Sequence, residues 1–242
     1  MKIATQPGVN PLDTLSAHTE NIAAQTRQQT RQQRAAFRDT RLRFARLYPI
    51  DDGEHQQAAA NAAWATIRGA ASGTFISGSG TVAKLRLKSD TTTDQWDDMY
   101  RLAWYFDTEG VIRTESIIHA ARVIIRAESV TDNFGSSIVL CAADADNDPP
   151  PPNSGYADYG SVDFGVTRPA LADLTADRRF SIQLNKAGLD HLNVGGVTAL
   201  GLRFDGDFDN VEPTWQSGVV DEVQIGALHA STPAELELEY YY

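Results

Sequence analysis

The chain has 242 residues, of which 42% are apolar and 22% charged, and its net charge at pH 7 is −11. This composition is typical of a folded globular protein and excludes a collagen-like protein or a disulfide scaffold. The lone cysteine, Cys141, excludes an internal disulfide and a cysteine-cluster zinc site. No run of 18 apolar residues is present, so we expect no membrane span.

Charge is distributed unevenly along the chain. Residues 1–48 carry eight Lys or Arg and three Asp or Glu, a net charge of +5, whereas the remainder has a net charge of −16. This asymmetry predicts a basic arm and an acidic body with separate roles. The acidic total argues against binding of nucleic acid through its phosphates by the whole chain.

The first segment is predicted to be a helical arm over residues 1–48. Residues 12–47 contain no glycine or proline, are rich in Gln, Ala and Arg, and are followed by Pro49. On a helix, five arginines spaced by 4, 3, 4 and 3 residues share one face: Arg27, Arg31, Arg34, Arg38 and Arg41. Such a stripe is typical of a solvated face, of an arm that docks on an acidic partner or on copies of itself, or of a phosphate contact. The lack of interleaved aromatic residues argues against nucleic acid, and we expect the arm to anchor and oligomerise the chain.

Residues 49–73 are predicted to form a connector. The sequence Asp51-Asp52-Gly53 is a turn signal. The alanine-rich stretch 56–68 favours a short helix that buries Trp64 and Ile67.

Residues 74–242 are predicted to form an antiparallel β-sandwich or jelly roll, so that the whole chain is mainly β after its helical arm. Short stretches of alternating or apolar residues are separated by Gly, Asn and Asp, which favours many short strands over a parallel α/β sheet. The expected strands are 81–88, 99–106, 117–127, 137–142, 180–184, 197–204, 219–225 and 236–242. The expected core residues are Leu85, Leu87, Trp104, Phe106, Val123, Ile125, Leu140, Ile182, Leu184, Leu200, Leu202, Val223, Ile225 and Leu238.

Several of these strands carry a recognisable order of motifs. The sequence WYFDT at 104–108 precedes IIHAARVII at 117–125, and FSIQLNKAGL at 180–189 precedes LGLR at 200–203 and LELEY at 236–240. This order resembles the disaggregatase-related, or DNRLRE-like, carbohydrate-binding-type β-sandwich. Such sandwiches occur in cell-surface proteins, in some polysaccharide-binding proteins and in many bacteriophage structural proteins.

The resemblance implies a bacteriophage structural protein located in the virion. The arm would anchor to other capsid or tail proteins, and the sandwich would act as a capsid decoration, a head fibre or a tail-associated adhesin. Because phage proteins of this kind are often trimers, we expect a homotrimer. The alternative is a carbohydrate-binding module that recognises a host-surface glycan.

Signals for catalysis are weak. The sequence holds no nucleophile elbow, Walker loop, dinucleotide fingerprint or zincin helix, so we expect no enzyme and no cofactor. A polysaccharide-degrading enzyme with paired carboxylates is the less favoured alternative. The alternating Asp205, Asp207 and Asp209 are typical either of a solvated acidic loop or of oxygen ligands for calcium. Cys141 lies in an apolar stretch and is expected to be a buried thiol.

Aromatic residues in the predicted loops are the candidates for a recognition surface. Tyr156 and Tyr159 lie in the long 144–175 loop, and Trp215 lies in the 205–217 loop. A flat ring can stack on the apolar face of a sugar, or it can pack locally into the fold. Local packing is the favoured interpretation for each of the three rings, and the recognition role would require them to be exposed.

Overall fold

The computed structural model describes residues 42–77, 82–143, 153–228 and 230–242. The chain divides into two compact units, residues 1–42 with Tyr242 and residues 43–241. The elements below all belong to the second unit. The predicted arm up to residue 41, with its five arginines, and the proline run at 149–152 lie outside the described residues.

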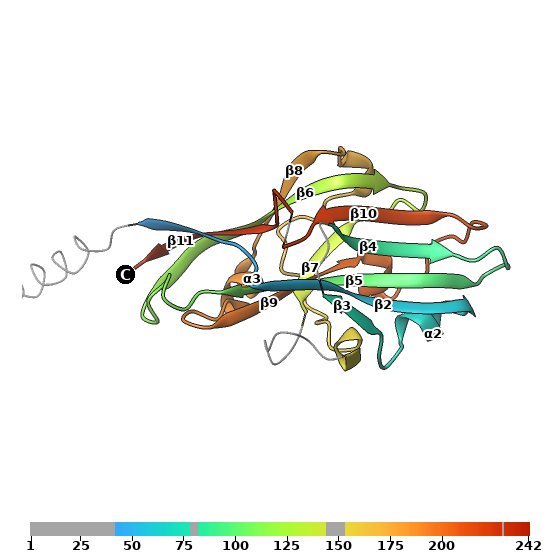
Figure 1. The fold of residues 1–242 in the computed structure, drawn as a ribbon, viewed down its shortest axis with the longest axis horizontal. Coiled ribbons are helices and arrows are strands. Elements are labelled where there is room, and N and C mark those ends of the chain that lie inside the picture. Colours follow the sequence, from blue (N-terminus) through green and yellow to red (C-terminus); the bar gives the residue numbers. More distant parts are fainter. Residues whose placement is uncertain (1–41, 78–81, 144–152, 229) are drawn as a thin grey trace, which may run out of the picture. The chain divides into compact units, whose positions relative to one another are not determined.

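The described unit is mainly β, as the sequence predicts, and its strands form one antiparallel hydrogen-bonded sheet of eleven strands (Figure 1). The strands are β1 (Arg43–Leu47), β2 (Asp51–Ala62), β3 (Thr74–Ser77), β4 (Val82–Ser89), β5 (Trp96–Asp107), β6 (Ile117–Thr131), β7 (Ile138–Ala142), β8 (Arg178–Gln183), β9 (Val197–Phe204), β10 (Val220–Gly226) and β11 (Glu235–Tyr241). The described helices are short: α2 (Trp64–Arg68), α3 (Lys186–His191), α4 (Asp205–Asp209), and the 3₁₀ turns η1 (Asn153–Tyr156) and η2 (Leu171–Asp173). None of these helices is long and apolar enough to cross a membrane.

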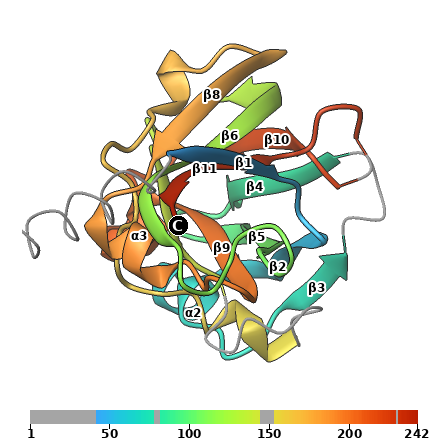
Figure 2. The same ribbon diagram turned by 90° about the vertical axis from the view of Figure 1, so that its left-hand side faces the viewer.

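The sheet branches at β5 and β6. The main path runs β1-β11-β6-β10-β4-β5-β2-β3, while β8 pairs with β6, β9 pairs with β5, and β7 pairs with β9. In Figure 2, β8, β6 and β10 lie above β9, β5 and β2, and β4 lies between β10 and β5. The pairing of β4 with β5 joins the two halves, so one hydrogen-bonded network holds the unit together.

The interior is built from the side chains that the sequence alternation selects. All fourteen predicted core residues are buried, which confirms that prediction. Register places Leu102 opposite Leu202 and Leu202 opposite Leu140, so three neighbouring strands contribute leucines to one face. Burial of such side chains stabilises the fold by about 25 cal/mol per Å² of apolar surface.

Two predictions for residues 43–73 are wrong. Residues 43–47 form β1, not the end of a helix, and the alanine-rich residues up to 62 form β2, so helix is present only at α2. β2 pairs with β5 on one edge and with β3 on the other, and this pairing overrides the helix propensity of its alanines. Residues 49–73 therefore include strand β2 of the sheet and are not a connector. The predicted domain boundaries at 48 and 73 do not mark the start of the β unit.

Candidate functional site

Tyr156 is not part of a recognition surface, because its side chain is fully buried, in agreement with local packing. Its hydroxyl donates a hydrogen bond to the carbonyl of Ile67 at 3.0 Å, which satisfies a carbonyl at the end of α2. The guanidinium of Arg101 lies 4.0 Å from the centre of its ring. Tyr156 therefore fastens η1 to α2.

Tyr159 is also buried, so its candidate role in recognition is wrong as well. Its ring packs so closely on Gly201 of β9 that a Cβ atom there would lie 2.7 Å from it. Its hydroxyl lies 3.1 Å from Nδ1 of the buried His55. The ring joins a small core cluster with Tyr105 and Cys141, so this loop covers the sheet and presents neither tyrosine to a ligand. The predicted burial of the Cys141 thiol is confirmed.

Beneath these tyrosines lies a buried ionic cluster that the sequence analysis did not identify. The Asp207 carboxylate accepts hydrogen bonds from Arg101 at 2.7 and 2.8 Å and from Arg203 at 2.8 and 2.9 Å. All three side chains are buried. Burial disfavours the charged form of Asp207, but the two guanidinium groups outweigh it and hold the pKa of this carboxyl below its usual range. The Arg203 to Asp207 spacing of four residues hints at the pair, whereas Arg101 is distant in sequence.

This cluster argues against calcium at the acidic run 205–209, which forms α4 and not an acidic loop. Asp207 is saturated by the two arginines, and Asp209 pairs with Arg168. Asp205 Oδ1 accepts from the backbone N–H groups of Ser137 at 3.1 Å and of Gly206 at 2.9 Å. The three carboxylates have separate partners, and the described residues contain no group of three or more His, Cys, Asp or Glu that could hold a metal ion.

Trp215 remains partly exposed and lines a shallow depression of about 590 Å³. We call this feature the tryptophan depression. Its lining residues are Ala63, Trp64, Ala65, Asp94, Glu212, Pro213 and Trp215. They come from the start of α2, from the turn before β5 and from the loop before β10, so no sequence motif marks them as one site.

The tryptophan depression is backed by aromatic residues, of which Trp64 and Trp96 are buried and Phe134 is half-buried. The rings of Trp64 and Trp96 lie 5.2 Å apart, and Trp96 lies 5.4 Å from Phe134. The indole N–H of Trp96 donates to Glu212 Oε1 at 2.8 Å, and the indole N–H of Trp215 donates to the carbonyl of Gln95 at 3.1 Å. These bonds fix one carboxylate and one ring of the lining.

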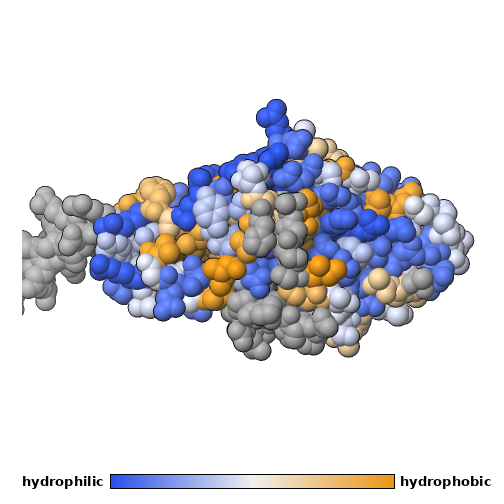
Figure 3. Space-filling model, viewed as in Figure 1, coloured by the Kyte–Doolittle hydropathy of each residue, from blue (hydrophilic) through white to orange (hydrophobic). Residues whose placement is uncertain are grey.

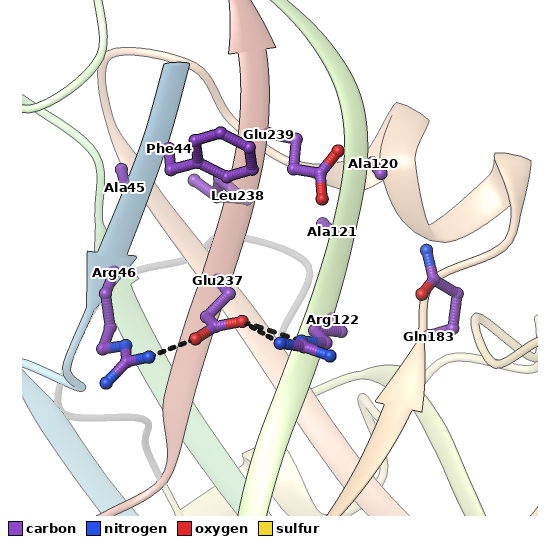
Figure 4. Close-up of a pocket in the computed structure, with 10 residues that line it drawn as sticks. All are labelled: Phe44, Ala45, Arg46, Ala120, Ala121, Arg122, Gln183, Glu237, Leu238 and Glu239. Atoms are coloured by element: carbon purple, nitrogen blue, oxygen red, sulfur yellow. Dashed lines mark hydrogen bonds and ion pairs between the residues drawn. The ribbon is translucent and has the colours of Figure 1, made fainter. Parts of the chain in front are cut away.

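A second hollow, of about 320 Å³, lies across β1, β11 and β6 (Figure 4). Its lining residues are Phe44, Ala45, Arg46, Ala120, Ala121, Arg122, Gln183, Glu237, Leu238 and Glu239. Glu237 lies between two arginines: it accepts a hydrogen bond from Arg46 and another from Arg122 at 2.7 Å. These groups compensate one another, so the hollow presents a charged row with little unpaired charge.

Exposed apolar side chains gather beside this hollow. Phe44, Tyr48 and Ile50 are 70%, 51% and 48% exposed, respectively, and lie on or next to β1. β1 pairs with β11 along one edge, and no other described strand pairs with it. We call these three residues and the second edge of β1 the β1 surface. Elsewhere, the face drawn in Figure 3 is largely hydrophilic with small apolar patches.

Comparisons with known proteins identify no family. No family model matches the chain, and no curated protein matches it. One similar solved structure is xylanase 10C (mutant E385A) from Cellvibrio japonicus in complex with xylopentaose, with 10% identity and a TM-score of 0.35 over 74% of this chain and 27% of the xylanase chain. Another is the mud crab tombus-like virus, with 9% identity and a TM-score of 0.30 over 84% of this chain and 81% of that chain. The present chain thus spans about a quarter of the xylanase, and similarity at this level assigns neither family nor function.

Proposed function

We propose that the chain is a non-enzymatic structural protein of a virion, with residues 1–48 anchoring it to the particle and the β unit displayed as a capsid decoration, head fibre or tail-associated adhesin. The order of sequence motifs over residues 104–240 supports the bacteriophage assignment. The paths β11-β6-β10-β4 and β2-β5-β9-β7 within the branched sheet support a β-sandwich as its architecture.

The observation that carries the anchoring role is the β1 surface. It places three exposed apolar side chains, and a strand edge with which no other described strand pairs, directly after a segment of net positive charge. Exposed apolar patches and open strand edges are typical of sites of protein association. The described clusters at Asp207 and Glu237 are saturated ion pairs, which suit a structural role better than acid–base chemistry.

The particle itself provides the first test. Antibody labelling of purified particles from the source virus should place the chain on the assembled capsid or tail, with the β unit accessible. A chain that is absent from purified particles would refute the virion role.

A surface variant provides the second test. Phe44→Glu should reduce incorporation into particles and self-association in sedimentation velocity, because it puts a charge into the β1 surface. Val166→Glu replaces an exposed apolar residue, 60% accessible, outside that surface and should have neither effect. Normal incorporation and self-association of Phe44→Glu would exclude the β1 surface as the anchoring site. Self-association as a trimer would agree with the proposed homotrimer.

A carbohydrate-binding module is the second candidate. With Tyr156 and Tyr159 buried, this role depends on Trp215 in the tryptophan depression. Binding of a glycan panel by the full chain, lost in Trp215→Ala, would favour it. Hydrolysis of the bound glycan would favour the enzyme instead.

A further inference from the structure

We propose that the tryptophan depression binds an arginine side chain from residues 27–41 of a second copy of the chain. This inference rests on the oligomerising role proposed for the arm. It goes beyond that role because it identifies a receiving site that is separate from the β1 surface.

The chemistry of the lining selects a ligand that donates hydrogen bonds. The side-chain acceptors are the carboxylates of Asp94 and Glu212, and no lining residue is basic. The indole N–H of Trp215 is committed to Gln95, and that of Trp64 is buried. The accessible polar groups of these side chains are therefore acceptors, and a guanidinium or ammonium group, which has donors and no acceptor, complements them.

The carboxylates have capacity for such a ligand. Glu212 uses Oε1 for Trp96, and among the described residues Oε2 has no partner. Asp94 is exposed at a turn, where its φ of +55° holds it in the left-handed region, and its carboxylate likewise has no described partner. Two negative charges beside an indole ring attract a cation both through Coulomb forces and through the ring face.

Arginine suits this depression better than lysine. A planar guanidinium stacks on an indole face while its N–H groups reach carboxylates, whereas an ammonium is a strongly hydrated point charge. The chain supplies five arginines between residues 27 and 41, and its only lysine before residue 42 is Lys2. The net charges of +5 and −16 on the two parts of the chain are complementary over longer distances as well.

The arginines are assigned to a second copy because of the length of β2. Residue 41 adjoins β1, whereas the depression lies beside α2, at the opposite end of β2 in Figure 1. Twelve residues of strand extend about 40 Å. In the helical form predicted from the sequence, the 14 residues from Arg41 to Arg27 extend about 21 Å, too short a distance to return along β2.

The test uses the full chain and a fluorescent peptide of residues 24–41 as the probe, with binding followed by anisotropy at low salt and at 0.15 M salt. Glu212→Gln and Trp215→Ala should each weaken binding at least tenfold, and a peptide with its arginines replaced by glutamine should not bind. Glu212→Gln keeps an oxygen that can accept from Trp96, so it removes charge without removing that bond. Asp190→Asn, an equal charge change at an exposed residue of α3, is the matched control and should bind as the wild type does.

Thermal unfolding of each variant verifies that it is folded, and Trp215→Phe retains a ring should Trp215→Ala fail to fold. Equal binding by Glu212→Gln and the wild type would overturn the proposal, and so would equal weakening by Asp190→Asn, which would indicate unspecific attraction to an acidic surface. Binding of glycans in place of the peptide would overturn it in favour of the carbohydrate role. Failure of the peptide to bind the wild type would also overturn the proposal. The anchoring role would remain intact, because that role is tested by Phe44→Glu and by the location of the chain on particles.

Discussion

Replacing Asp207 with asparagine should destabilise the β unit strongly. The carboxylate of Asp207 is 2% exposed and shared by the guanidinium groups of Arg101 and Arg203, which are 3% and 5% exposed. Asparagine keeps the shape but leaves two buried cations without their counter-charge. Removing one partner from a buried ion pair costs about 3–5 kcal/mol. For a domain of this size, that corresponds to a fall of about 6–20 °C in Tm.

The same carboxylate should make stability depend on pH. Because its pKa is lower in the folded than in the unfolded protein, its contribution is complete above the unfolded value of about 3.9 and is lost as pH falls through the folded value. The free energy of unfolding of the wild type should therefore decrease in acid. The difference between wild type and Asp207→Asn should shrink over the same range.

Urea titration with tryptophan fluorescence at pH 7 measures the first effect, and the same titration at a series of acidic pH values measures the second. The control is Asp177→Asn, which removes a carboxylate that is 71% exposed in its pair with Arg126. Surface pairs contribute about 0–1 kcal/mol, so this variant should unfold close to the wild type. If Asp207→Asn unfolds at the same urea concentration as Asp177→Asn, the account of the buried cluster is wrong.

Three further predictions concern the core. Leu202→Ala should lower the free energy of unfolding by about 2–5 kcal/mol in urea titration, because Leu202 is fully buried between Leu102 and Leu140; a loss below 1 kcal/mol would contradict its place in the core. Tyr159→Ala should cost about 3–5 kcal/mol in the same assay, since its ring fills space over β9, and a neutral effect would show that the loop does not cover the sheet. Burial raises the pKa of the Cys141 thiol to about 12, so a thiol reagent at pH 8 should label it only in urea, and fast labelling of the native protein would refute this.

The strands from residue 82 onward could be predicted because their two-residue alternation reflects burial of one side of the chain. β9 spans residues 197–204 as expected, and the other predicted strands are displaced by a few residues at most. β2 could not be predicted, since its Gln- and Ala-rich half favours a helix and becomes a strand only through pairing with β5. Local propensity carries no information about a partner strand whose paired residues lie 34 or more positions away.

The candidate site was predicted only in part. Trp215 is partly exposed, as its candidate role requires, but its neighbours Trp64, Asp94 and Glu212 come from three separate segments that only the fold brings together. The sequence left the burial of Tyr156 open, because a loop rich in Gly, Asn and Asp is typical of solvent-exposed segments. The signal that could have identified it is the arginine in β5, Arg101, which needs buried acceptors near it.

The pairing of β1 with β11 has a consequence for synthesis on the ribosome. Residue 43 lies opposite residue 240, so β1 is synthesised well before β11, its partner strand. Translation of the intervening 200 residues, roughly, takes about 10–40 s at 5–20 residues per second. During that interval both edges of β1 are unpaired while the basic arm ahead of it is already complete. We therefore expect β1 to be exposed to neighbouring nascent chains on one polysome until β11 has been synthesised and pairs with one of the two edges.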